Sequence, residues 1–439
     1  MPLLPEPLSN PRLLAYASGN FGKNLLWGTV DITLMYLLTE QLGLSAALAG
    51  GLIFASLILD AVLYPWIGRL ADQLRSPLGR YGPLILFGTL VAVASFVALF
   101  AMTHLNAPVA LIALSLALFR LGYACLDLSH NALLTQISAA VTDNGRVAIL
   151  RFLFSSLATL ALAAVLPGLV REASPDSPLQ EAPLTALTIL LPLIGGGTIL
   201  LAWLAVRAWD RHAHQQSPPK QAAFLAGLKA PNTVLILTVG AVAALFLPLF
   251  NKASLYFATQ WLGEAQSASW LLGAMVAGQI FSLPLWLYLS PRGSKARSMQ
   301  WAHALSALGF LLGVLGTLTT GPNLAWLMLS SAIAGSGLSG IYALIWALIS
   351  DAAAELEIQH SLPLSGQLFA WAIFSQKLAM GLGAGLFGLA MSASGYERTP
   401  ILQISRDTIL GFSFVLPALG SLICMAILEA IMRRSHKTP

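Results

Sequence analysis

Charged residues are scarce in this chain of 439 residues, where Asp, Glu, Lys and Arg together make up 9% and hydrophobic residues 57%. A soluble globular domain carries about 25% charged residues. So few charges cannot cover a water-facing surface, which excludes a soluble enzyme and a DNA-binding protein. The net charge of +5 therefore does not indicate a nucleic-acid partner, because basic residues in a membrane protein mark the loops that stay inside.

Cysteine is nearly absent as well. Cys125 and Cys424 both lie in apolar runs, so they provide neither a disulfide framework nor the spacing of a metal site. No nucleophile–base pair or cofactor fingerprint occurs at a usable spacing, and we expect no catalytic residues, no metal and no cofactor beyond a coupling ion. The N-terminus also lacks the basic and apolar regions of a signal peptide, so the first spanning helix is expected to direct insertion.

Long apolar runs make up most of the sequence. Each is long enough to cross a bilayer core of roughly 30 Å as a helix, and about twelve such spans are predicted. The runs are too long and too uniformly apolar for the strands of a barrel. The expected spans are 12–40, 46–70, 83–103, 108–134, 146–171, 185–208, 230–261, 267–290, 298–319, 323–350, 364–394 and 405–432.

The distribution of basic residues predicts the topology. Most of the 23 Lys and Arg residues fall in cytoplasmic segments if both termini are cytoplasmic. The polar, basic stretch 209–229 then forms a cytoplasmic linker between an N-terminal six-helix bundle, 1–208, and a C-terminal six-helix bundle, 230–439. This all-α plan of two bundles around a midplane site is that of the major facilitator fold.

Eight charged residues lie within the expected spans. A charge at a helix centre costs about 2.5–3.5 kcal/mol on insertion scales, so these side chains must face one another or a water-filled cavity. Structural ion pairing remains an alternative to a functional role for each of them. The eight are Lys23, Arg120, Arg151, Lys252, Lys377, Asp31, Asp60 and Asp127.

Helical spacing places several polar residues on shared faces. Residues four or seven apart lie on one side of a helix. The pairs that meet this spacing are Asn24 with Asp31, Asp60 with Tyr64, and Asp127 with Asn131. More of the expected spans carry polar faces in the first half of the chain than in the second. We therefore expect the first half to supply most of the polar residues of a solute and ion site.

With these residues in view, the chain resembles the glycoside–pentoside–hexuronide:cation symporters, the melibiose permease branch of the major facilitator superfamily. The resemblance extends over nearly the full length and keeps the order and spacing of its segments. They are GNFGKNLLWG at 19–28, LDAVLYPWIGRLADQLRSPLGRYGP at 59–83, LDLSHNALL at 126–134, RVAILRF at 146–152 and SDAAAELEIQHSLPLSGQLFAWAIFSQKLAMGLGAG at 350–385.

The resemblance implies a set of solute-binding residues: Asn24, Asp31, Asp127, Asn131, Arg151 and Lys377. Asp127, Arg151 and Lys377 keep the residue types of melibiose-type members. Asn24 stands where those members have a sugar-binding carboxylate. Asn131 replaces a Trp that stacks on the sugar, and Asp31 replaces a Tyr, so the chain departs from the family pattern within the implied site.

The resemblance also implies a cation-coupling set of Asp60, Asp127, Tyr64 and Lys377. The sodium-using pattern has more oxygen ligands, and Leu63 and Ala124 supply none where it has an amide and a threonine. Sodium needs several hard oxygen ligands. Burial favours the protonated form of a carboxylate and a nearby cation favours the ionised form, so we expect H⁺ rather than Na⁺ as the coupling ion.

A further group of residues resembles the cytoplasmic loop motif of the superfamily, which implies a gate. Asp72 falls at a helix C-terminal end, where the macrodipole disfavours a carboxylate, so a partner such as Arg75 is expected. The acidic residues after the tenth span are expected to form the other half of the gate. The gating set is Gly68, Asp72, Arg75, Arg80, Asp351 and Glu355.

We therefore expect a multi-pass cell-membrane protein, in a prokaryote an inner-membrane protein, that moves a sugar, glycoside or related small polar solute by alternating access with a cation. The lipid bilayer is its environment, and no nucleic acid or obligate protein partner is expected. Two alternatives stay open: a carrier of the same fold for a lysolipid or organic anion, and a membrane sensor without transport.

Overall fold

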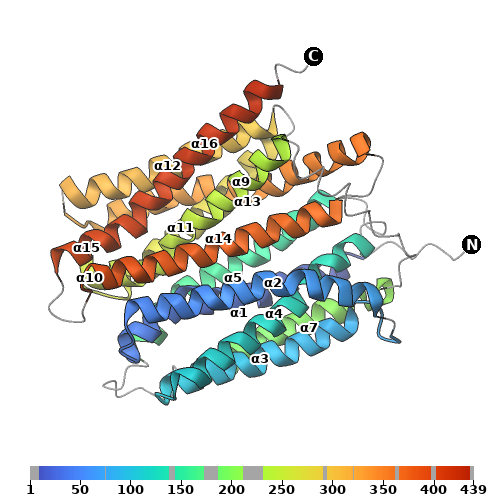
Figure 1. The fold of residues 1–439 in the computed structure, drawn as a ribbon, viewed down its shortest axis with the longest axis horizontal. Helices are drawn as coiled ribbons and strands as arrows, with labels where there is room; N and C mark the ends of the chain where they lie inside the picture. Colours follow the sequence, from blue (N-terminus) through green and yellow to red (C-terminus); the bar gives the residue numbers. More distant parts are fainter. Residues whose placement is uncertain are drawn as a thin grey trace, which may run out of the picture. The chain divides into compact units, whose positions relative to one another are not determined.

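A computed structural model describes residues 9–74, 76–137, 144–172, 186–210, 231–289, 294–319, 321–360, 365–396 and 402–435. Within these ranges every regular element is helical (Figure 1). Ten helical segments are long and apolar enough to cross a membrane, and Leu150–Leu166 is a shorter apolar helix. The all-helical prediction is confirmed, and the structure supports a multi-pass membrane protein.

The chain forms two compact units. Unit 1 comprises Met1–Gly43 and Val62–Gln215, and unit 2 comprises Leu44–Ala61 and Gln216–Pro439. The helix α2, Ala46–Gln73, is continuous and contributes its first part to unit 2 and its second part to unit 1.

Unit 1 is a bundle of helices held together by close backbone approaches. Helix α3 packs on α4 and α7, and α1 packs on α5 and α7 (Figure 1). A Cβ on Gly22 of α1 would lie 2.2 Å from the Gly195 carbonyl oxygen of α7, so the two backbones touch there, as small residues allow in membrane bundles. The helices are α1 Asn10–Tyr36, η1 Leu37–Gln41, α3 Gly82–His104, α4 Val109–Ile137, α5 Asn144–Glu172, η3 Ala186–Leu190, α7 Leu191–Val206 and η4 Arg207–Trp209.

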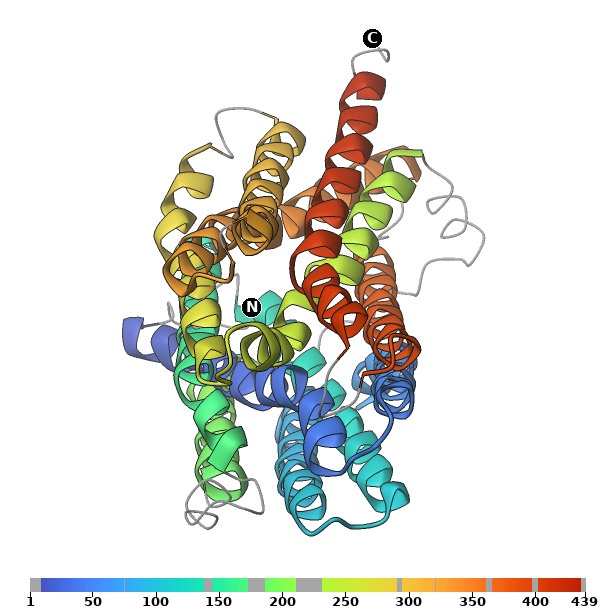
Figure 2. The same ribbon diagram turned by 90° about the vertical axis from the view of Figure 1, so that its left-hand side faces the viewer.

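Unit 2 is built in the same way. Helix α12 packs on α13 and α16, α13 packs on α11, and α9 packs on α14 and α16; Figure 2 shows the red α16 beside the yellow-green α9. Gly50 of α2 and Gly388 of α14 bring those backbones into contact. The helices are α9 Pro231–Phe246, α10 Leu249–Trp261, α11 Ser267–Leu289, α12 Lys295–Thr319, α13 Leu324–His360, α14 Ser365–Ala393, α15 Gln403–Leu410, η6 Gly411–Val415 and α16 Leu416–Ser435.

Two details differ from the spans expected from the sequence. Helix α1 is long but is not among the ten apolar segments, since it carries Lys23, Asp31 and several other polar residues. Helix α13 does not end near residue 350 but continues to His360. Asp351 and Glu355 therefore lie on the last turns of a helix rather than in a loop after it.

Candidate functional site

A buried ion pair lies between α1 and α4 in unit 1. Lys23 Nζ lies 2.8 Å from Asp127 Oδ1, and the two side chains are 5% and 18% exposed. The same ammonium donates to Asn131 Oδ1 at 2.9 Å. Asp127 and Asn131 are one turn apart on α4, so a single cation binds both, as their four-residue spacing allows.

The second oxygen of the Asp127 carboxylate also has a partner. Tyr64, on the part of α2 that belongs to unit 1, donates its hydroxyl to Asp127 Oδ2 at 2.8 Å. Tyr64 is buried. The carboxylate thus accepts from a cationic donor on one oxygen and from a neutral hydroxyl on the other, which holds it in one orientation.

Arg151 of α5 joins this network from the other side. Its guanidinium donates to Asn131 Oδ1 through one terminal nitrogen and to Asn20 Oδ1 through Nε at 3.3 Å. Asn131 is therefore shared by two cations, Lys23 and Arg151. In the bonds described here, the Arg151 side chain binds two amides.

Asn24 faces the same helix, α5. Its side-chain amide donates to Ser155 Oγ at 2.9 Å and to the Asn20 carbonyl oxygen at 3.0 Å. Asp31, two turns further along α1, is half-buried. The predicted solute-binding residues of the first half therefore come from α1, α4 and α5 of one unit, and four of them, Asn24, Asp127, Asn131 and Arg151, belong to one chain of hydrogen bonds through Lys23, Asn20 and Ser155. We call this group the first-unit network.

Unit 2 holds a second buried pair. Lys377 of α14 donates to Asp60 Oδ2 on the first part of α2, with side chains 12% and 0% exposed. Within the part of the chain that the structure describes, Asp60 Oδ1 has no hydrogen-bond partner. A buried carboxylate paired on one oxygen only is an exception among native polar groups and calls for an explanation. The structure thus brings two of the predicted cation-coupling residues together.

Arg120 is buried inside unit 1. It is 2% exposed, and its guanidinium carbon lies 4.3 Å from the centre of the Trp27 ring. This distance is within the range of cation–π attraction, which is stronger where water is excluded. Arg120 therefore packs in the bundle rather than reaching out toward the membrane surface.

The predicted gating residues divide into those that the structure describes and those that it does not. Arg75 lies outside the described residues, as does the side chain of Asp72. Gly68 lies on α2, where an added Cβ would meet only a Leu128 methyl group at 3.9 Å. Arg80 donates through Nε to the Ala71 carbonyl oxygen at 3.2 Å, which ties the loop to the last turns of α2.

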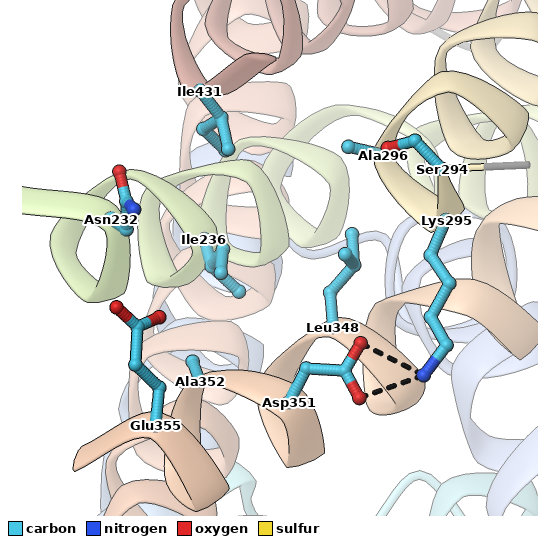
Figure 3. Close-up of a pocket in the computed structure, with 10 residues that line it drawn as sticks. All are labelled: Asn232, Ile236, Ser294, Lys295, Ala296, Leu348, Asp351, Ala352, Glu355 and Ile431. Atoms are coloured by element: carbon cyan, nitrogen blue, oxygen red, sulfur yellow. Dashed lines mark hydrogen bonds and ion pairs between the residues drawn. The ribbon is translucent and has the colours of Figure 1, made fainter. Parts of the chain in front are cut away.

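A cavity of about 390 Å³ in unit 2 contains the remaining predicted gating residues (Figure 3). Lys295, at the start of α12, donates to both carboxylate oxygens of Asp351 at 2.7 and 2.8 Å. Glu355 and Asn232 line the opposite side of the same cavity. The Asp351 side chain is 55% exposed, and an exposed pair of this kind contributes about 0–1 kcal/mol to stability.

Sequence reasoning missed three members of the first-unit network as site residues: Lys23, Asn20 and Ser155. A signal for them exists. Asn20, Lys23 and Asn24 share one face of α1 by their spacing of three and four, and Ser155 lies one turn from Arg151. The sequence identifies Lys23 only as one of the charges within the spans, because spacing on one helix does not tell which other helix a side chain faces.

Comparisons with known proteins decide the family. The family model described as "MFS/sugar transport protein" matches residues 15–435. The chain belongs to this family. It is therefore a membrane transporter rather than an enzyme, and the resemblance to the sugar–cation symporters found in the sequence is confirmed.

Curated relatives align with most of the length of this chain. An uncharacterized symporter, YnaJ of Bacillus subtilis, is 25% identical over 89% of this chain and 84% of its own length. The glucuronide carrier protein homolog of Escherichia coli is 21% identical over 89% and 85%. A putative sulfoquinovose importer of Salmonella typhimurium is 23% identical over 90% and 83%.

Solved structures show the same fold. The nucleoside transporter NupG has a TM-score of 0.64 at 16% identity, over 97% of this chain and 99% of its own. A POT family transporter in complex with a thioalcohol-conjugated peptide has a TM-score of 0.67 at 13% identity, over 97% and 96%. These similarities give a transporter fold of the major facilitator type, and at such identities they carry no information on the solute.

Proposed function

We propose that the protein is a proton-coupled symporter of a sugar or glycoside that works by alternating access. The observation that carries the proposal is the first-unit network, in which Lys23, Asp127, Asn131 and Arg151 are held by one another inside a membrane-spanning bundle. Ionised side chains buried in such a bundle are costly and usually mark a solute or ion pathway. Relatives named as symporters and as carriers of sugar derivatives support this reading.

The donors and acceptors of the network suit a polyhydroxylated solute. Lys23 and Arg151 donate, Asp127 accepts, and the amides of Asn24 and Asn131 do both. Each bond that these groups now make to one another can be exchanged for a bond to a sugar hydroxyl. Such exchange keeps every buried polar group paired in both states, which limits the cost of emptying the site.

The charges of the network favour an acidic sugar over a neutral one. The network contains two cations, Lys23 and Arg151, and one carboxylate, Asp127. The residue at position 24 is an amide where melibiose-type members have a carboxylate. Arginine is well suited to bind a carboxylate or sulfonate through two parallel bonds. Relatives named as a glucuronide carrier homolog and a putative sulfoquinovose importer fit this solute class.

The Asp60–Lys377 pair is the proposed proton site. Asp60 Oδ1 lacks a hydrogen-bond partner among the described residues, so a proton placed there disrupts no bond that the structure shows. Protonation would weaken the attraction of Lys377 for the other oxygen. Asp60 and Tyr64 are one turn apart on α2, and Tyr64 donates a hydrogen bond to Asp127. A movement of α2 caused by protonation of Asp60 would therefore be passed to the first-unit network through Tyr64.

Counterflow in proteoliposomes tests the proposal. Vesicles are loaded with an unlabelled solute and diluted into the labelled one, for a panel of neutral glycosides, uronic acids, sulfonated sugars and lysolipids. We expect accumulation of a sugar, strongest for an acidic one. Arg151→Gln should abolish it, while Asp407→Asn, an exposed carboxylate bonded to Gln403, is the matched control and should not. Absence of counterflow for every sugar, with or without a pH or sodium gradient, would overturn the proposal.

A further inference from the structure

A buried carboxylate outside the predicted site caps the N-terminus of α3. Asp210 Oδ1 accepts from the backbone N–H groups of Arg80 at 3.0 Å and Tyr81 at 3.1 Å, and Oδ2 accepts from Tyr81 at 3.0 Å and Gly82 at 2.8 Å. Asp210 is 4% exposed. The first N–H groups of a helix have no partner within the helix and favour an anion, so this contact is a strong one.

The neighbouring backbone is shaped around this carboxylate. Gly79 has a φ of +93°, which L side chains rarely adopt. A Cβ at Gly79 would lie 2.4 Å from Asp210 Oδ2, inside contact distance. Burial raises the pKa of the adjacent Tyr81 phenol above its ordinary value, with Arg80 lowering it and Asp210 raising it.

The origin of the cap is unusual. No side chain at the N-cap of α3 makes the cap bond, although a local Ser, Thr or Asp commonly does so. The acceptor comes instead from the end of η4, 128 to 130 positions further along the chain. A local cap would be independent of other helices, whereas this one holds only while the end of η4 stays against the start of α3.

Three elements meet at this point. Arg80 gives its backbone N–H to Asp210 and its Nε to the Ala71 carbonyl oxygen of α2. Asp210 directly precedes the segment 211–230, which joins the two halves of the chain. The end of α2, the start of α3 and the end of η4 in unit 1 are thus joined through the Asp210 carboxylate and the Arg80 side chain.

We propose that Asp210 is a positioning residue of the transport cycle: it fixes the loop 76–81 to the end of η4, so that the start of α3 and the end of η4 move together. This role rests on the proposed transport function. Asp210 lies outside the first-unit network and contacts none of its residues in the bonds described here, so its removal should change the rate of the cycle and leave solute binding intact.

Two variants break the contact from opposite sides. Asp210→Ala removes the acceptor, and Gly79→Ala drives a methyl group into it. Gly43→Ala is the matched control for the second, because Gly43 has a similar φ of +64° but no atom within 4 Å of its Cβ position. Asp210→Asn keeps one acceptor oxygen and should be intermediate.

The experiment combines hydrogen exchange of the purified full chain with solute binding and counterflow. We expect faster amide exchange at residues 80–82 in Asp210→Ala and Gly79→Ala, and a counterflow rate lower by about tenfold, as the loss of the charge-assisted bonds to Asp210 allows. The Kd for the transported sugar should stay within about twofold of the parent. Combining the two substitutions should give little further loss, because both break one contact.

Each other outcome counts against a definite part of the proposal. Unchanged exchange at residues 80–82 would refute the anchor. Faster exchange with an unchanged counterflow rate, or equal losses of rate and affinity, would refute the positioning role. If the parent protein moves no sugar at all, the transport function and the positioning role fall together, while the exchange result still decides whether Asp210 is the anchor.

Discussion

Lys23 and Asp127 form an ion pair inside the first unit, with Nζ 2.8 Å from Oδ1 and both side chains largely buried. Such a pair adds little stability over an apolar one, but breaking it by removing one partner leaves a buried charge uncompensated. The position of this pair at the centre of a hydrogen-bonded network therefore matters more for what the site binds than for what holds the fold together.

The pair predicts non-additive effects on stability. Lys23→Gln should destabilise the protein by about 3–5 kcal/mol, because Asp127 loses its cation. The double variant Lys23→Gln with Asp127→Asn should be more stable than Lys23→Gln alone, since no isolated charge remains. Thermal unfolding in detergent measures both, and a double variant less stable than each single one would contradict the pairing.

Helix contact in unit 1 gives a second prediction. Gly22→Ala should destabilise by about 1–3 kcal/mol, because its Cβ would lie 2.2 Å from the Gly195 carbonyl oxygen and the helices must separate. Gly197→Ala on α7 is the control, since nothing lies within 4 Å of its Cβ position. There the better helix propensity of Ala should be neutral or stabilise by up to about 1 kcal/mol. Equal unfolding temperatures for the two variants would refute the contact.

The fold class was accessible from the sequence because scarce charge and long apolar runs leave a helical membrane protein as the solution. The polar faces of α1 and α4 were also readable, since spacing of four and seven residues fixes a face. The partners of these polar side chains could not be predicted from the sequence. Which cation meets Asp127 depends on how α1 and α5 are rotated against α4, and a single sequence does not contain that rotation.

Two further features could not be predicted from the sequence, each for a different reason. The contacts of Asp210 are with backbone N–H groups, which every residue carries, so no residue pattern marks them. The continuation of α13 to His360 crosses from apolar to polar sequence without a Gly or Pro to end the helix, and the apolar run alone defined the expected span.

The amide at position 24 predicts which charge on the solute the protein prefers. Asn24→Asp would add a carboxylate to the network and, by like-charge repulsion, should weaken binding of an acidic sugar more than binding of its neutral counterpart, by about tenfold in their ratio. A thermal-shift titration of both solutes with the parent and the variant measures it. A ratio that does not change, or that moves toward the acidic sugar, would contradict the acidic-solute proposal and leave sugar transport itself in place.

Proton movement on solute addition tests the central proposal most directly. When the transported sugar is added outside weakly buffered, de-energised proteoliposomes, we predict that the external medium becomes more alkaline as protons enter with it. Asp60→Asn should abolish this alkalinisation and keep counterflow, because the neutral amide mimics the protonated form, while Asp407→Asn should behave like the parent. Sugar uptake that sodium stimulates at constant pH, with no alkalinisation, would contradict proton coupling at Asp60.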